Sequence, residues 1–160
     1  MGQERNTSKG VARLLKDIAK AKTIALDTMM FSYHYSGDTV FAPLARVVFE
    51  AIEQGEVSAI ASSFALAEIL AGITQTGDMT AKQSYFDLIT SFPNLTFIPF
   101  DNEIAYLFAG LRSSIGLKPI DSVHVATAQV AHVDLLISND SAWRNRFTKP
   151  KLILLNDYLN

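Results

Sequence analysis

Five short apolar runs, none of which alternates with polar residues, divide this chain into longer segments. The runs are Thr23–Leu26, Val57–Ala61, Leu95–Pro99, Leu135–Ile137 and Leu152–Leu155. A strand that is apolar on both of its faces is buried on both faces, which is typical of a parallel sheet covered by helices on each side. We therefore predict an α/β fold in three layers, with a central, mostly parallel sheet of about five strands.

The segments between the runs carry the boundary signals of helices. We predict helices from Lys9 to Lys20, from Asp38 or Thr39 to about Gln54, from Ser62 or Ser63 to about Ile73, from Thr80 to Ser91, from Asp101 to about Ile115, and from Pro119 to about Ala131. Asp101 is a capping residue, Gly116 ends a helix, and Pro119 fits the first helical turn. In such sheets, ligands bind beyond the carboxyl ends of the strands, at the topological switch point.

Length and composition fit one globular domain and exclude several classes of protein. The chain has 160 residues, of which 49% are hydrophobic and 19% charged, and it has no cysteine. A disulfide framework and a thiolate zinc site are therefore excluded. The longest apolar stretch, Ala59 to Ile73, is too short to span a bilayer, and the polar first ten residues lack a signal-peptide core, so we expect a cytoplasmic protein. With a net charge of −2, nucleic-acid binding would need a local basic patch and bound cations.

Four of the 16 acidic residues lie in apolar surroundings. Asp27 directly follows the first apolar run, and Asp140 follows the fourth. Glu68 is the only charged residue between Ala59 and Ile73, and Asp121 opens an apolar helical segment. A carboxylate in such surroundings is at least partly desolvated, which costs several kcal/mol unless something compensates. No Lys or Arg is adjacent in sequence to any of the four.

These four carboxylates are predicted to converge at one end of the sheet. Taken singly, Asp27 and Asp140 have a simpler interpretation as cap or turn residues, and Asp121 as a first-turn charge that favours the helix dipole. Glu68, in the middle of an apolar helix, has no such helix-end role. Together they would repel one another unless a cation neutralised them, and hard oxygen ligands select Mg²⁺ or Mn²⁺. The chemistry that this predicts is attack on a phosphodiester by a metal-activated water.

Four segments also resemble a known family. They are Leu26–Phe31 (LDTMMF), Ser63–Gly72 (SFALAEILAG), Pro119–Ala128 (PIDSVHVATA) and Ile137–Asp140 (ISND). In this order and with these spacings the chain resembles the PIN-domain ribonucleases, and among them the toxins of the VapC type. The resemblance implies a PIN-like domain over residues 22–160, preceded by an N-terminal extension over residues 1–21 with a short helix. Ser122 and Ser138 depart from the Ala and Thr that are common in the family.

The resemblance implies that Asp27, Glu68, Asp121 and Asp140 are the catalytic and metal-binding residues, with Mg²⁺ or Mn²⁺ as the cofactor. It further implies a metal-dependent endoribonuclease that hydrolyses phosphodiester bonds of single-stranded or structured RNA, a homodimer, and the role of a toxin paired with an antitoxin. The alternative is a catalytically silent PIN-fold module that binds RNA or protein. The presence of all four acids disfavours this alternative.

Other residues near these acids are secondary candidates. The hydroxyls of Thr28 and Ser138 are suited to orient a carboxylate or a metal-bound water, and Asn139 is suited to bind phosphate or to form a turn. For His124 we expect packing at a helix interface rather than a role as general base. Possible RNA-binding residues around the acids are Arg112, Lys118, Arg144 and Arg146.

Missing motifs argue against three other classes of phosphate-binding enzyme. A haloacid-dehalogenase-type phosphatase needs a second Asp two residues after its strand-end Asp, and here that position is Met29. The chain has neither GxxxxGK[ST] nor GxGxxG, so a P-loop enzyme and a dinucleotide enzyme are disfavoured.

Overall fold

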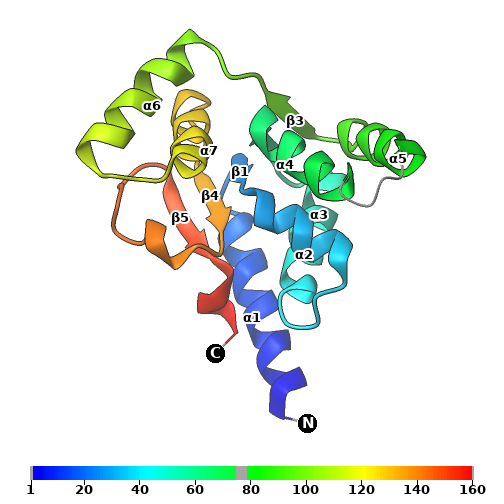
Figure 1. Cartoon of the computed structure of the whole chain (residues 1–160). Helices are drawn as coiled ribbons and strands as arrows, with labels where there is room; N and C mark the ends of the chain where they lie inside the picture. The colour runs from blue at the N-terminus through cyan, green and yellow to red at the C-terminus, as the bar shows by residue number, and fades with distance from the viewer. Residues whose placement is uncertain (1, 75–78, 160) are drawn as a thin grey trace.

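The computed structural model describes residues 2–74 and 79–159 (Figure 1). Its elements in chain order are α1 (Gly2–Ile18), β1 (Thr23–Leu26), α2 (Thr28–Ser36), α3 (Ala42–Glu53), β2 (Ser58–Ser62), α4 (Ser63–Thr74), α5 (Met79–Thr90), β3 (Leu95–Ile98), α6 (Asn102–Ser114), α7 (Pro119–Val130), β4 (Leu135–Ser138), the 3₁₀ helix η1 (Ser141–Trp143), β5 (Lys151–Leu154) and the 3₁₀ helix η2 (Leu155–Tyr158). None of the helices in these two stretches combines the length and the apolar character that a membrane span requires.

The five strands form one sheet in the order β3-β2-β1-β4-β5, and every neighbouring pair is parallel. The predicted three-layer fold and parallel sheet are thereby confirmed. The chain builds one half of the sheet outward from β1 and then crosses back to build the other half from β4. Leu26 at the end of β1 pairs with Ala61 of β2 and Ile137 of β4, so these three strands end level with one another. The topological switch point lies between β1 and β4.

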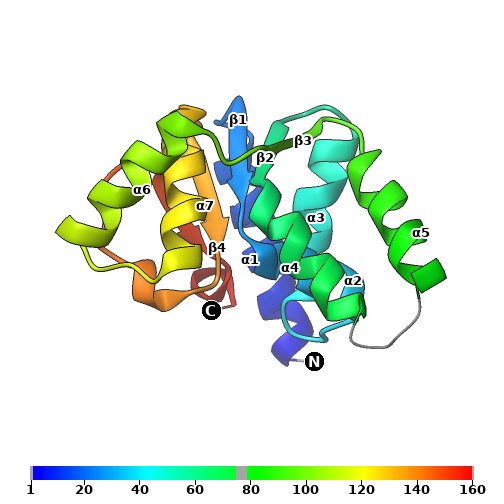
Figure 2. The ribbon, with the colours of Figure 1, turned by 45° about the horizontal axis from the view of Figure 1, so that its top comes forward.

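Side chains that alternate along each strand divide the interior into two cores. Ile24 and Leu26 face a core built with α1, α2 and α3, whereas Ala25 between them faces a second core built with α6 and α7. Figure 2 shows α6 and α7 on one side of the strands and α2 and α3 on the other. Because both faces are covered, strands of this sheet are apolar without alternation, as the sequence pattern predicted.

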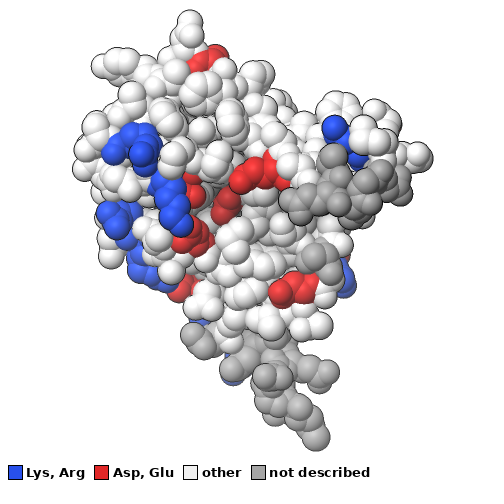
Figure 3. Space-filling model, in the orientation of Figure 1, with Lys and Arg blue, Asp and Glu red and all other residues white. Residues whose placement is uncertain are grey.

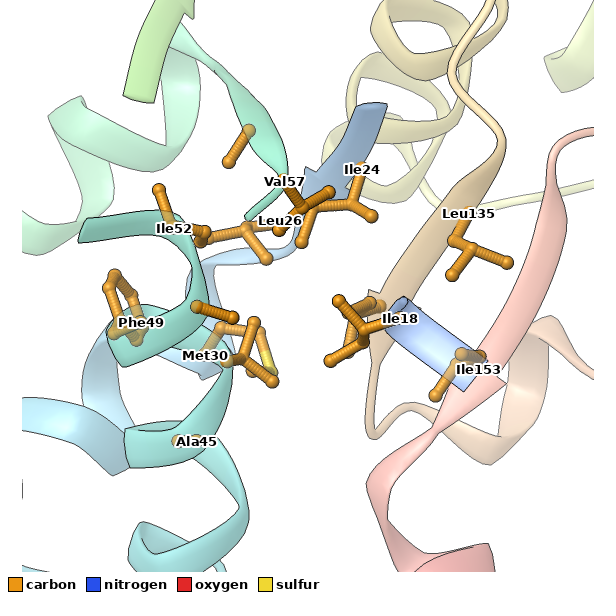
Figure 4. Packing of buried hydrophobic residues seen from close by; sticks show 14 of the residues in the cluster. Ile18, Ile24, Leu26, Met30, Ala45, Phe49, Ile52, Val57, Leu135 and Ile153 are labelled. Atoms are coloured by element: carbon orange, nitrogen blue, oxygen red, sulfur yellow. The ribbon is translucent and has the colours of Figure 1, made fainter. Parts of the chain in front are cut away.

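Helix α1 is a part of the first core. It begins at Gly2, well before the predicted Lys9, and its Leu14 and Ile18 are fully buried. Figure 4 shows Ile18 within this core, between Met30 on one side and Leu135 and Ile153 on the other. At the carboxyl end of the chain, the Tyr158 hydroxyl of η2 donates a hydrogen bond of 2.8 Å to Asp17. The extension therefore covers one face of the sheet instead of standing apart from it.

Helix α2 was not predicted from the sequence. Its apolar residues follow one another directly instead of recurring every three or four positions, so the sequence shows no helical period there. Met30 and Phe31 are nevertheless fully buried against the first core. Asp38, predicted as a possible cap, lies in the turn before α3, where its carboxylate accepts the N–H groups of Val40 and Phe41, while the N-cap residue itself is Phe41. Because α2 begins at Thr28, Asp27 at the end of β1 is also the N-cap residue of α2.

Candidate functional site

The four predicted carboxylates line one pocket of about 230 Å³ beyond the carboxyl ends of β1 and β4. Its lining residues are Asp27, Thr28, Met29, Ser32, Glu68, Ile120, Asp121, His124 and Asp140. No Lys or Arg is among them. Figure 3 shows acidic side chains gathered near the middle of this face, with Lys and Arg side chains beside them on the side of α6 and α7. The structure thus brings together all four acids that the sequence singled out.

Asp27 is the buried member of the set, with 5% of its surface exposed. Its N–H donates to the carbonyl of Ile137, which holds the residue directly above the β1–β4 pair. The Ser138 hydroxyl donates to Oδ2 of Asp27 at 2.6 Å and accepts the N–H of Asp140 at 3.0 Å. Burial raises the pKa of Asp27, and neighbouring His124 and the Ser138 hydrogen bond oppose that rise. Ser138 therefore connects two of the acids through a single hydroxyl.

Glu68 is partly desolvated, as predicted, but it is the most exposed of the four acids, with 39% of its side chain accessible. Helix α4 is apolar although it lies at the surface, and its exposed face includes Ala67 and Ala71 beside Glu68. The Thr28 hydroxyl donates to Oε2 of Glu68 at 2.5 Å, and Nε2 of His124 lies 3.3 Å from the same oxygen. The hydrogen bond with His124 is the main cause that lowers the pKa of Glu68. Glu68 is thus held at the pocket by two neighbours.

Asp121 and Asp140 come from the other half of the molecule. Asp121 lies in the first turn of α7, where burial raises its pKa and the charge of Asp140 adds to the rise. The indole N–H of Trp143 lies close enough to lower that pKa, yet it makes no hydrogen bond that meets ordinary geometry within the described parts of the chain. Asp140 also caps η1, since its Oδ1 accepts the N–H of Ala142 at 2.8 Å. A capping role and a place in the pocket therefore coincide in this residue.

The chemistry of these donors fits a divalent cation, although their present arrangement is not a closed coordination shell. Four hard-oxygen donors face one pocket without a cationic lysine or arginine, and burial raises the pKa of both Asp27 and Asp121. Over residues 2–74 and 79–159, no three His, Asp or Glu side chains stand close enough to hold one ion together. A closed shell would require the carboxylates to stand closer to one another than they do here.

His124 is the residue whose position the sequence interpretation missed. It is 3% exposed, as a packing residue would be, but its Nε2 faces the acids and lies 3.9 Å from Oδ1 of Asp27. It follows Asp121 by three residues on the same helix, and residues with this spacing share one face. This three-residue spacing was the sequence signal that could have placed His124 beside the acids.

Asn139 lies outside the pocket lining, and its amide is engaged elsewhere. Its Nδ2 donates to the Tyr33 hydroxyl at 3.1 Å, and its Oδ1 accepts the N–H of Asn156 at 2.8 Å. These bonds connect the end of β4 with α2 and η2. The predicted contact with phosphate would require these bonds to break.

The four predicted RNA-binding residues are all exposed, but they are not equally available. They are Arg112 in the last turn of α6, Lys118 at the start of α7, and Arg144 and Arg146 after η1. Arg144 forms a two-pronged ion pair with Asp157 at 2.6 and 3.0 Å. Arg112 donates to the carbonyl of Leu117, and Arg146 to that of Ile115. The Lys118 ammonium group makes no hydrogen bond or ion pair with any other described residue.

A larger pocket, of about 570 Å³, lies at the opposite end of the sheet and includes Asp134 in its lining. Oδ2 of Asp134 accepts the N–H groups of Lys22 and Thr23, so this carboxylate fastens the amino end of β1. Asp134 directly precedes β4, which puts it at the end of the strand opposite Asp140. Size alone therefore does not identify the functional site.

Comparison with known proteins agrees with this geometry. The family model of the PIN domain matches residues 24–146. Three similar solved structures are VapBC2 from Rickettsia felis bound to a promoter DNA fragment (18% identity, TM-score 0.65, covering 82% of this chain and 98% of that one), a toxin–antitoxin complex from Klebsiella pneumoniae (18%, 0.61, 82% and 97%) and FitAcB from Neisseria gonorrhoeae (19%, 0.64, 82% and 97%). At these identities the likeness concerns the fold. No curated protein matches the chain in sequence.

Proposed function

Because this chain belongs to the PIN domain family, we propose that it is a Mg²⁺- or Mn²⁺-dependent endoribonuclease that hydrolyses phosphodiester bonds of single-stranded RNA. The observation that carries the proposal is the convergence of Asp27, Glu68, Asp121 and Asp140 on one pocket that has no basic lining residue. Such a pocket repels a phosphodiester unless cations are bound, so its charge favours metal-dependent phosphate chemistry.

In this proposal the residues of the chain divide into three tasks. The four acids would hold the metal, and Ser138 and Thr28 orient two of them through hydrogen bonds to Asp27 and Glu68. When bound, the ion supplies Lewis-acid polarisation of the phosphate and lowers the pKa of the attacking water. Lys118 and its basic neighbours hold flanking phosphates, which compensates locally for the net negative charge of the protein.

The decisive experiment is cleavage of labelled single-stranded RNA with Mn²⁺, with and without EDTA. Replacement Asp27→Asn should reduce the rate by a factor of at least about 100, because it removes a negative ligand at the centre of the site. The matched control is Asp101→Asn, since Asp101 is an exposed N-cap of α6 and Asn caps helices equally well. Cleavage that persists in EDTA or in Asp27→Asn would contradict the proposal.

The same experiment tests the alternative of a silent binding module. That alternative expects the wild-type protein to retain labelled RNA, in Mn²⁺ as in EDTA, without cleaving it. Single-stranded DNA of the same sequence serves as the comparison substrate, and we expect it to be cut more slowly than RNA.

We further propose that the chain is the toxin of a toxin–antitoxin pair and that it forms a homodimer. One of the three similar structures, from Klebsiella pneumoniae, is described as a toxin–antitoxin complex. Large side chains exposed on α4, α6 and the β3–α6 connection offer surface for protein partners, namely Phe64 (38% exposed), Phe100 (40%) and Tyr106 (81%).

Three measurements test this second part. Induced expression should arrest growth, and Asp27→Asn should relieve the arrest. The product of a small open reading frame directly upstream of the gene should copurify with the chain and neutralise it. Light scattering of the isolated chain should give the mass of a dimer, and a monomer together with no growth arrest would overturn this part while leaving the nuclease proposal intact.

A further inference from the structure

We propose that His124 is a positioning residue that holds Glu68 at the pocket through a proton on Nε2. The inference rests on the proposed metal site and adds a residue to it. Nε2 of His124 lies 3.3 Å from Oε2 of Glu68, and Oγ1 of Thr28 lies 2.5 Å from the same oxygen. Two donors from different elements, α7 and α2, therefore converge on one carboxylate oxygen that a third element, α4, supplies.

Glu68 needs such support more than the other acids do. Its side chain is 39% exposed on a surface helix, and a free Glu side chain loses rotamer entropy when it is fixed in one position. Asp27 is held by burial and by Ser138, and Asp140 by its cap bond to Ala142. Among these acids, Glu68 is the most exposed and has the longest side chain. Its position accordingly depends on the donors that reach it.

His124 is suited to this task because it is itself immobile. Only 2% of its side chain is exposed, and its ring lies 6.4 Å from the ring of Trp143. Its Nδ1 is buried and makes no hydrogen bond within the described residues, so the interactions of the ring converge on Nε2. In the neutral ring one nitrogen carries the proton, and a proton on Nε2 is the arrangement that bonds to a carboxylate.

The expected consequence is a metal affinity that depends on a residue outside the ligand shell. Residues that orient a metal ligand typically change metal affinity by about 10- to 100-fold when they are replaced. His124→Leu removes the donor while keeping an apolar side chain in a buried place, so the fold should persist. His124→Gln returns an N–H donor at a similar reach and should recover most of the affinity.

The test combines a spectroscopic and a binding measurement. Two-dimensional NMR of the imidazole nitrogens in the metal-free protein should show a proton on Nε2 of His124, and this proton should remain when Mg²⁺ is added. Isothermal titration with Mn²⁺ should give a dissociation constant about 10- to 100-fold weaker for His124→Leu than for the wild type, with recovery in His124→Gln. The melting temperature of each variant, recorded in EDTA, confirms that it is folded.

Each contrary result has a defined meaning. A metal-free ring without a proton on Nε2 would overturn the inference, and so would loss of that proton on metal addition, because Nε2 would then be a direct ligand. Equal Mn²⁺ affinity in the wild type and in His124→Leu would overturn it as well. If the wild-type protein binds no Mn²⁺ at all, the proposed function fails, whereas the prediction for the Nε2 proton of the metal-free protein stays separately testable.

Discussion

Removing the side-chain oxygen of Ser138 tests the arrangement of the site most directly. Ser138 is fully buried at the end of β4, and its hydroxyl both donates to Asp27 and accepts from the N–H of Asp140. Replacement Ser138→Ala removes both bonds and leaves the backbone otherwise unchanged. We expect a marked loss of stability in the metal-free protein and a weaker affinity for Mn²⁺.

The magnitude follows from the two bonds. A hydrogen bond to a charged group contributes about 1.5–3 kcal/mol, and a backbone N–H left without a partner costs about 1–3 kcal/mol. Because Asp27 can relax by taking up a proton, we expect a total near the lower end, about 3 kcal/mol. For a chain of this length, 1 kcal/mol corresponds to about 2–4 °C in melting temperature, so the expected decrease is about 6–12 °C.

A second fully buried serine provides the matched control. The hydroxyl of Ser122 in α7 donates only to the carbonyls of its own chain segment, Lys118 and Leu117, at 3.0 and 3.4 Å. Its replacement by Ala should cost about 1 kcal/mol or less, since the lost bond is neutral and Ala favours the helix. Urea denaturation in EDTA can follow Trp143, the only tryptophan of the sequence, which is buried beside the site.

The pH dependence gives an independent check on Ser138→Ala. Burial raises the folded pKa of Asp27 above its unfolded value, so the ionised carboxylate opposes folding, and stability falls as the pH rises through the window between the two values. The Ser138 bond limits this rise in pKa. Its removal should therefore cost most at neutral pH and progressively less as the pH falls toward the ordinary Asp value. A cost no larger than that of Ser122→Ala, or one independent of pH, would refute the reasoning.

Three further predictions address the charge of the site, the first helix and the basic rim. In EDTA, Asp27→Asn should melt about 2–4 °C higher than the wild type, because a neutral isostere replaces a buried charge. The variant should also lose the stabilisation by Mn²⁺, which for the wild type is about 2.7 kcal/mol at a Mn²⁺ concentration 100 times the dissociation constant. An unchanged response of the melting temperature to Mn²⁺ would contradict this prediction. Ile18→Ala should lower the free energy of unfolding by about 2–4 kcal/mol in urea titrations, since Ile18 is 2% exposed, and a cost below about 1 kcal/mol would mean that α1 is not part of the cooperative core. Lys118→Ala should weaken RNA binding and reduce the slope of log affinity against log salt concentration by about 1. Arg144→Ala should change this slope less, because Asp157 already pairs with the Arg144 guanidinium. Equal effects of the two variants would argue that this ion pair opens when RNA binds.

Much of the fold could be predicted because its signals are local. The apolar runs at residues 23–26 and 135–137 are buried on both faces, and a chain in which such runs alternate with helical segments has few solutions other than a covered parallel sheet. The predicted caps at Asp101 and the first-turn Pro119 were confirmed because capping depends on adjacent backbone groups. Helix α2 escaped prediction because tertiary packing of Met30 and Phe31, rather than any periodic pattern, stabilises it.

The site was predictable in part for a related reason. Asp27 and Asp140 follow neighbouring parallel strands, and the carboxyl ends of such strands lie at the same edge of a sheet. Glu68 was singled out for its apolar sequence context, but that context belongs to a surface helix, so its side chain stays 39% exposed and is desolvated only in part. Sequence hydropathy does not state whether an apolar helix is covered.

The sequence by itself determined which residues are acidic, which runs must be buried, and which end of the sheet receives Asp27 and Asp140. Only the tertiary structure decided how the groups from different elements meet. It joined Ser138 to Asp27 across 111 positions of the chain, brought His124 of α7 to Glu68 of α4 across 56 positions, and paired Arg144 with Asp157. The physical reason is that burial and secondary structure follow from local patterns, whereas a hydrogen bond between distant side chains depends on the packing of every element that lies between them.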